Sequence, residues 1–127
     1  MNPILFIALA VIAYFSVAEI RAQTANYPDK PIKMMVGFSA GGGTDVIARI
    51  VAQKMSEGLG QSVLVENRPG ASGMIAAEAV TKSAPDGYTL MMGSQTTLAV
   101  APSLYRKFSI DPAKDFVGVA LTGTSPL

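Results

Sequence analysis

Histidine and cysteine are both absent from the 127 residues of this chain. Their absence excludes Ser-His and Cys-His nucleophile systems, zinc sites built from cysteine and histidine, and any disulfide framework. Charge is also scarce, because charged residues make up 15% of the chain and the formal net charge is +1. A balance this close to neutral lacks the electrostatic footprint of a nucleic-acid-binding protein. What remains is chemistry carried by carboxylates, hydroxyl groups and the backbone.

Hydrophobic residues, in contrast, make up half of the sequence. Such a composition predicts a packed core rather than a disordered chain. A length of 127 residues is that of one domain. We therefore expect a single folded unit.

Residues 4–17 form an almost wholly apolar run near the start of the chain. A run of about 14 residues is short for a membrane span, which needs about 20, but it is typical of the hydrophobic region of a secretory signal. Small residues follow at Ser16, Ala18 and Ala22. We expect residues 1–22 to be a signal peptide, cleaved after Ala18 or Ala22. The preceding MNP carries no lysine or arginine, and an uncleaved anchor or a buried helix are the alternatives.

Residues 30–55, KPIKMMVGFSAGGGTDVIARIVAQKM, combine an apolar run, three glycines and an amphipathic pattern. The apolar run predicts a buried strand over residues 32–38. The pattern predicts a helix that begins at Thr44 and Asp45. A glycine turn at residues 41–43 that leads into a helix N-terminus presents free backbone N–H groups and the positive end of the helix dipole, which suit an anion. The apolar residues at helical spacing, expected to face the core, are Val46, Ile47, Ile50, Val51, Met55 and Leu59.

Shorter predicted elements follow in alternating order. Strands are predicted over residues 62–67, 88–92 and 116–121, and helices over residues 74–83 and 98–105. This alternation predicts an α/β layer with a mostly parallel sheet, flanked by helices and joined by right-handed crossovers. Ligands bind such sheets at the carboxyl ends of the strands.

Two loops are expected at that edge of the sheet. The glycine turn follows the first strand, and a hydroxyl-rich loop at residues 94–97 follows the third. We therefore expect the two loops to converge on one cleft. Ser94, Thr96 and Thr97 would cap the following helix or donate hydrogen bonds to a ligand, and both roles are compatible.

The glycine turn lacks the residues that phosphate and dinucleotide sites require. A P-loop needs Lys-Ser/Thr after its last glycine, where this chain has Thr44 and Asp45. The dinucleotide pattern needs a further glycine where this chain has Val46. A small carboxylate held by backbone N–H groups is one interpretation, and a tight turn without a ligand is the other. A doubly wound nucleotide-binding enzyme domain is the hypothesis from another class, and the glycine spacing and the leader argue against it.

Asp45 is interpreted as a helix-start residue that complements the dipole, rather than as a catalytic group. Arg49 lies one helical turn further on, so an exposed i,i+4 ion pair is the simplest expectation. The methionines, among them Met34, Met35 and Met91, are expected to fill the core.

Three motifs in succession carry a resemblance to a known family. They are YPDKPIKMMVGFSAGGGTDVIARIVAQKM, then GQSVLVENRPGASGMIAAEAV, then APDGYTLMMGS. From Tyr27 to Leu127 the chain resembles the periplasmic solute-binding proteins of tripartite tricarboxylate transporters, also called the Bug family. The resemblance implies a type II periplasmic-binding-protein fold, in which two α/β lobes close on a small ligand. Members of that family are much longer, so we expect residues 23–127 to be the N-terminal part of the first lobe and the chain to be a fragment.

The same resemblance implies a function. It implies a periplasmic, non-enzymatic protein without cofactor, metal ligands or catalytic residues, and a monomer at full length. Such a protein captures a small carboxylate through main-chain N–H groups, hydroxyls and water, and delivers it to a membrane permease. Carried over to this sequence, the ligand-binding residues would be Phe38, Ser39, Ala40, Gly41, Gly42, Gly43, Thr44, Asp45, Ser94, Gln95, Thr96 and Thr97.

Overall fold

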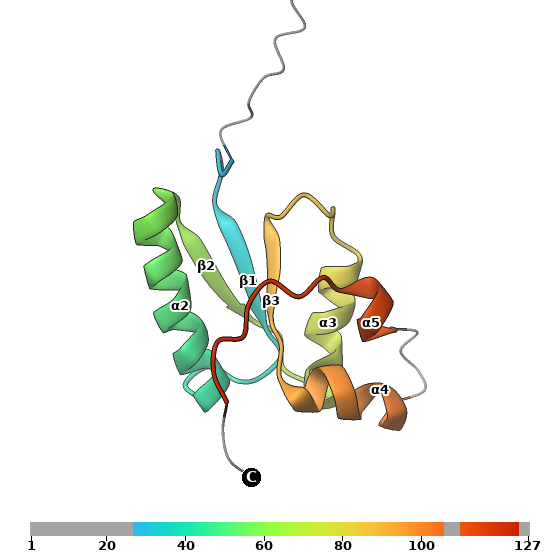
Figure 1. Cartoon of the computed structure of the whole chain (residues 1–127). Helices are drawn as coiled ribbons and strands as arrows, with labels where there is room; N and C mark the ends of the chain where they lie inside the picture. Colours follow the sequence, from blue (N-terminus) through green and yellow to red (C-terminus); the bar gives the residue numbers. More distant parts are fainter. Residues whose placement is uncertain (1–26, 106–109, 125–127) are drawn as a thin grey trace, which may run out of the picture.

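The computed structural model describes residues 27–105 and 110–124 (Figure 1). The expected signal peptide, residues 1–22, lies outside the described residues. The strands are β1 (Ile32–Val36), β2 (Val63–Asn67) and β3 (Thr89–Met92). The helices are α2 (Gly43–Leu59), α3 (Met74–Thr81), α4 (Ala101–Leu104) and α5 (Pro112–Asp115), with helical turns η1 (Ala71–Gly73) and η2 (Thr96–Val100).

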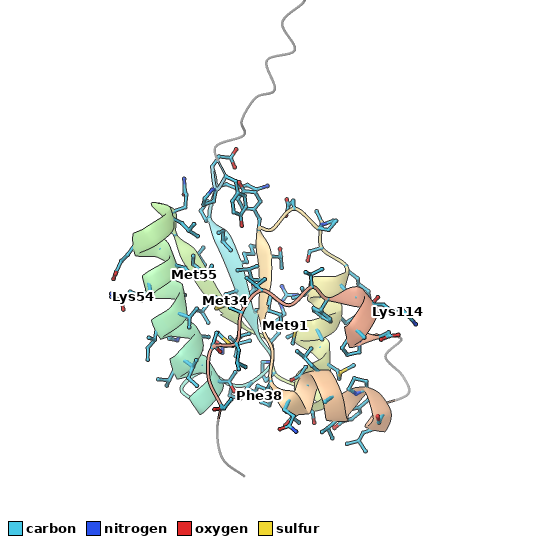
Figure 2. The ribbon with its side chains drawn as sticks, in the orientation of Figure 1. Met34, Phe38, Lys54, Met55, Met91 and Lys114 are labelled. Carbon is cyan, nitrogen blue, oxygen red and sulfur yellow. The ribbon has the colours of Figure 1, made fainter. Side chains whose placement is uncertain are left out.

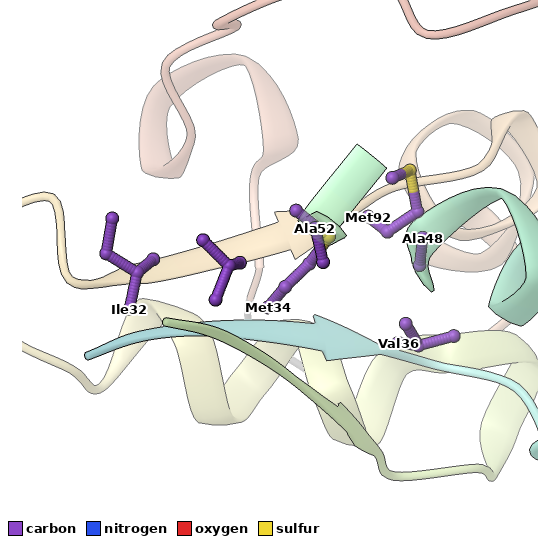
Figure 3. Packing of buried hydrophobic residues seen from close by; sticks show 7 residues of the cluster. Ile32, Met34, Val36, Ala48, Ala52 and Met92 are labelled. Atoms are coloured by element: carbon purple, nitrogen blue, oxygen red, sulfur yellow. The ribbon is translucent and has the colours of Figure 1, made fainter. Parts of the chain in front are cut away.

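The three strands form one parallel sheet in the order β2-β1-β3. β1 therefore occupies the centre, where both of its edges are hydrogen-bonded. Helix α2 contacts β1 and β2, and α3 contacts β1 and β3. The two helices lie on opposite faces of the sheet, as the close view in Figure 3 shows. The predicted α/β layer with a parallel sheet is confirmed.

The core lies between α2 and the sheet. Ile32, Met34 and Val36 of β1 are almost fully buried there because alternate residues of a strand point to the same face. They pack against Ala48 and Ala52 of α2 (Figure 3). The expected role of the methionines as core residues is confirmed for the buried ones, Met34, Met35, Met74 and Met92.

Helix α2 buries only part of the face that its apolar pattern predicts: Val51 and Met55 are partly buried and pack against the core. Its buried residues are Asp45, Ala48 and Ala52, whereas Val46, Ile47 and Ile50 are between 44% and 58% exposed. The small alanine side chains allow the helix to lie close to the sheet, and the larger residues are left at the margins. The exposed side of α2 also carries charged residues, and Lys54 there points away from the sheet (Figure 2).

The predicted strand over residues 116–121 is wrong. This segment is extended but belongs to no sheet in the described structure. Its alternate apolar residues Val117, Val119 and Leu121 are 89%, 84% and 83% exposed. The sequence pattern of a strand is present, but a strand also needs a neighbour that pairs with its backbone N–H and C=O groups. The segment instead crosses in front of β3 (Figure 1), where the Thr122 hydroxyl lies 3.7 Å from Met92 Sδ.

The predicted helix over residues 98–105 begins earlier than expected. η2 starts at Thr96 and leads into α4, with Pro102 in the first turn of α4. Among the described residues no helix is both long and apolar enough to cross a membrane.

Candidate functional site at the carboxyl ends of the strands

The loops that follow the three strands meet at one edge of the sheet. Val36 is level with Asn67 of β2 and with Met92 of β3, so all three strands end at the same height. The contact between the loops is unusually close. A Cβ atom on Gly37 would lie 2.5 Å from the Cα of Gly73, and one on Gly73 would lie 2.4 Å from Thr97 Oγ1. Only glycine permits this packing, which joins the loops after β1, β2 and β3.

The glycine turn leads directly into α2. Gly41 has a φ of +83°, a conformation that glycine adopts without strain. Gly42 is the extended residue that precedes the helix, and no side chain caps its N-terminus. The first N–H groups of any helix lack an intrahelical acceptor. The N–H groups of Gly43 and Thr44 occupy these positions in α2, and the glycine turn at residues 41–43 is exposed.

Asp45 lies in the first turn of α2, as expected, but its side chain is buried. It is 2% exposed, and its carboxylate points back under the turn. Its Oδ2 accepts hydrogen bonds from Gly41 N–H at 2.8 Å and from Arg49 Nε at 2.9 Å. Its Oδ1 accepts one from Asn67 Nδ2 at 2.9 Å. The expected i,i+4 pair with Arg49 is confirmed, but it is buried on the Asp45 side.

These contacts stabilise the ionised carboxylate. The hydrogen bonds from Arg49, Gly41 and Asn67, in that order of importance, hold the pKa of Asp45 far below its ordinary value, whereas burial opposes the shift. The pKa of Arg49 is raised in return, chiefly by its hydrogen bond to Asp45. Both groups remain charged at neutral pH.

Asn67 belongs to this network, and the sequence interpretation did not single it out. Its side-chain amide also donates to the carbonyl oxygen of Phe38 at 3.0 Å. It therefore joins the end of β2 to both sides of the glycine turn. The available signal was a polar residue at the carboxyl end of a predicted strand, which is the edge where sites form in such sheets.

The loop at residues 94–97 caps and braces η2. Ser94 Oγ accepts from Thr97 N–H at 3.2 Å, which confirms the expected capping role of Ser94. Thr97 is 1% exposed, and its hydroxyl donates to the Ser72 carbonyl at 3.0 Å. Gln95 and Thr96 are exposed and Ser94 is half-buried.

A cavity of about 1410 Å³ is lined by part of the predicted site, whereas residues 38–43, Asp45, Thr96 and Thr97 do not line it. Thr44 contributes from the start of α2, and Ser94 and Gln95 contribute from the loop after β3. The remaining walls are largely apolar and include Leu90 and residues 116–124. The cavity has hydrogen-bonding groups at the strand ends and a hydrophobic interior. Of the described residues, no three His, Cys, Asp or Glu side chains are grouped as metal ligands would be.

The chain matches a curated relative along almost its whole length. It is 45% identical over 124 residues to protein BugT of Bordetella pertussis, an alignment that covers 97% of this chain and 36% of BugT. The chain therefore spans about a third of the length of the curated relatives it matches.

Solved structures give the same result for the fold. A periplasmic transporter is 47% identical with a TM-score of 0.66, over 69% of this chain and 30% of the other. MatC from Rhodopseudomonas palustris, with bound malate, is 40% identical with a TM-score of 0.67, over 71% and 31%. R. palustris Rpa4515, with adipate, is 41% identical with a TM-score of 0.65, over 68% and 29%.

These likenesses confirm the expected relationship to Bug and periplasmic binding proteins, and the α/β architecture of part of one lobe. The family model described as "Tripartite tricarboxylate transporter family receptor" matches residues 47–127, which is more than half of the chain. The chain belongs to the tripartite tricarboxylate transporter receptor family.

Proposed function

We propose that this chain contributes one side of a binding cleft for a small carboxylate. The observation that carries the proposal is that Thr44, at the start of α2, and Ser94, in the loop after β3, line the same cavity. Two similar proteins are solved with malate and with adipate, both of which are dicarboxylates. Likeness at 40–41% identity makes the same class of ligand the best candidate here.

The chemistry of the strand ends supports a carboxylate over other anions. The N–H groups of Gly43 and Thr44 are hydrogen-bond donors at the positive end of a 17-residue helix. Ser94 adds a hydroxyl from the neighbouring loop. The residues that P-loops and dinucleotide sites use for phosphate are absent from this turn, because Thr44, Asp45 and Val46 stand in their places. The remaining proposed ligand residues, Phe38–Gly42, Asp45, Gln95, Thr96 and Thr97, would shape or support the site.

The setting of the protein follows from its family. We infer that it is a non-enzymatic solute-binding component that works in the periplasm and delivers its ligand to the permease of a tripartite transporter. Residues 1–22 would act as the export signal. A second lobe would supply the rest of the cleft, because a pocket usually buries most of its ligand.

The proposed function is tested by calorimetric titration of the protein, with its proposed second lobe present, against malate, adipate and malamide. Malamide is the neutral diamide of malate, so it keeps the carbon chain but removes both carboxylates. We expect heat of binding for at least one dicarboxylate and none for malamide. Binding of malamide as tight as that of malate would contradict carboxylate recognition. Binding of a neutral or cationic solute in place of every carboxylate would also contradict it.

A further inference from the structure

A single buried carboxylate lies beneath the glycine turn and joins three parts of the fold. Asp45, at 2% exposure, accepts hydrogen bonds from Gly41 of the turn, Arg49 of α2 and Asn67 of β2, all between 2.8 and 2.9 Å. It is the only charged residue among the buried ones described in the fold. Burial of a carboxylate is costly unless it is paired and hydrogen-bonded, and these three contacts meet that need.

The network holds both ends of the turn. Asn67 Nδ2 donates to the Phe38 carbonyl at 3.0 Å, and Asp45 Oδ2 accepts from Gly41 N–H at 2.8 Å. Asn67 is itself the last residue of β2 and is paired in register with Val36. These contacts attach the turn to the sheet as well as to its neighbours in the chain. Residues 42–44, which come next, therefore start from a backbone position that the sheet holds in place.

The charge of Asp45 is balanced within the network. An acidic side chain in the first turn of a helix would repel an anion bound at the same N-terminus. Arg49 Nε lies 2.9 Å from Asp45 Oδ2, and Arg49 Nη2 donates to Asn67 Oδ1 at 3.2 Å. The guanidinium therefore neutralises the carboxylate and also braces the amide that contacts it.

We propose that Asp45 is a positioning residue for ligand binding, which fixes the glycine turn so that the N–H groups of Gly43 and Thr44 face the ligand, while Arg49 cancels its charge. This inference rests on the proposed function, because it assigns how the carboxylate seat is held in shape. A merely structural role for Asp45 would affect stability but would leave the turn and the affinity of the folded protein unchanged.

Two substitutions separate placement of the turn from cancellation of charge. Asp45→Asn has one acceptor oxygen in place of two, so it cannot accept from all three donors. Arg49→Gln leaves the carboxylate and its bond to Gly41 but removes the balancing charge. Glu57→Gln is the matched control, because it makes the same acid-to-amide change on the exposed side of the same helix, where Glu57 pairs with Lys54 at 2.6 Å.

Hydrogen exchange of the Gly41 amide in the ligand-free chain is the first readout. We expect exchange to be at least tenfold faster in Asp45→Asn and unchanged in Arg49→Gln and Glu57→Gln. Malate affinity, measured by NMR titration, is the second readout. We expect it to fall at least tenfold in Asp45→Asn at every salt concentration. In Arg49→Gln it should fall mainly at low salt, because added salt screens the unbalanced charge.

The possible outcomes distinguish this inference from the proposed function. Unchanged Gly41 exchange in folded Asp45→Asn, or faster exchange with unchanged malate affinity, would overturn the positioning role. Absence of malate and adipate binding by the protein with both proposed lobes would overturn the proposed function and the ligand part of this inference, whereas the exchange rate of the Gly41 amide would still test how the turn is held. If Asp45→Asn does not fold, the test depends on Arg49→Gln. Malate affinity equal to that of the unsubstituted protein, measured for Arg49→Gln at low salt, would then overturn the inference.

Discussion

At the scale of single residues, Asp45 makes folding sensitive to acid. Hydrogen bonds from Arg49, Gly41 and Asn67 lower its pKa in the folded state, whereas an unfolded aspartate titrates at about 3.9. The folded protein therefore binds fewer protons than the unfolded chain over this range. The contribution of Asp45 to stability is fully present above the unfolded pKa and is lost as pH falls below it.

The corresponding prediction concerns the slope of stability against pH. Between pH 5 and pH 3 the free energy of unfolding should fall less in Asp45→Asn than in the unsubstituted protein, as measured by urea unfolding. The carboxyl groups of Asp86 and Asp111, whose pKa values are also lowered, contribute equally to both proteins. Parallel pH curves for the two proteins would contradict the role assigned to the buried carboxylate.

Single residues were also the least predictable part of the site. The sequence placed Asp45 at a helix start, where an exposed dipole-complementing residue is the usual finding. Its partner Asn67 is 22 residues away, and no spacing rule connects the two. The pairing of β2 with β1 and the packing of α2 against β2 bring them together, so the network could not be derived without the fold.

At the scale of elements, the loops at the strand ends depend on the contact between Gly37 and Gly73. A Cβ atom on Gly37 would meet the Cα of Gly73 at 2.5 Å, and a backbone atom cannot turn aside as a flexible side chain can. We predict that Gly37→Ala lowers the free energy of unfolding by about 1–3 kcal/mol through overpacking. Urea unfolding measures this effect.

Gly58→Ala is the matched control for that prediction. Gly58 lies within α2, and a Cβ atom there would meet nothing within 4 Å. Alanine favours a helix over glycine by up to about 1 kcal/mol, so this variant should be as stable as the parent or more stable. If Gly37→Ala and the parent have the same free energy of unfolding, the close contact between the loops contributes nothing to stability and the prediction is wrong.

The elements themselves were largely predictable, and their contacts were not. Periodicity identified the three strands of the sheet and helices α2 and α3, since local patterns determine where such segments form. It identified only part of the buried face of α2, where Val51 and Met55 pack against the core, because Ala48 and Ala52 carry little hydrophobic signal although they are the most buried. It also predicted a strand over residues 116–121, where the pattern is present but no described strand pairs with it.

At the scale of the whole molecule, the parallel sheet explains why residues far apart in sequence share one site. Parallel strands end on the same side, so the loops after β1, β2 and β3 are adjacent whatever their separation in sequence. This convergence was predictable from the alternation of elements. The ligand class that we propose comes from solved relatives that hold malate and adipate, because backbone N–H donors leave little side-chain signature of their ligand.

In the proposed function, backbone N–H groups at the start of α2 bind the carboxylate, and substitutions at Gly43 probe that contact. Gly43→Pro removes the N–H at the first helical position, where proline is well tolerated. The extended conformation of Gly42, with φ of −75° and ψ of 166°, suits a residue that precedes proline. Gly43→Ala keeps the N–H and meets no atom within 4 Å.

The measurement is the affinity of each variant for malate by NMR titration, with circular dichroism to confirm that both are folded. A hydrogen bond to a charged group is worth about 1.5–3 kcal/mol, so Gly43→Pro should bind malate at least about tenfold more weakly. Gly43→Ala should bind as the parent does. Equal malate affinity in Gly43→Pro and Gly43→Ala would contradict the account.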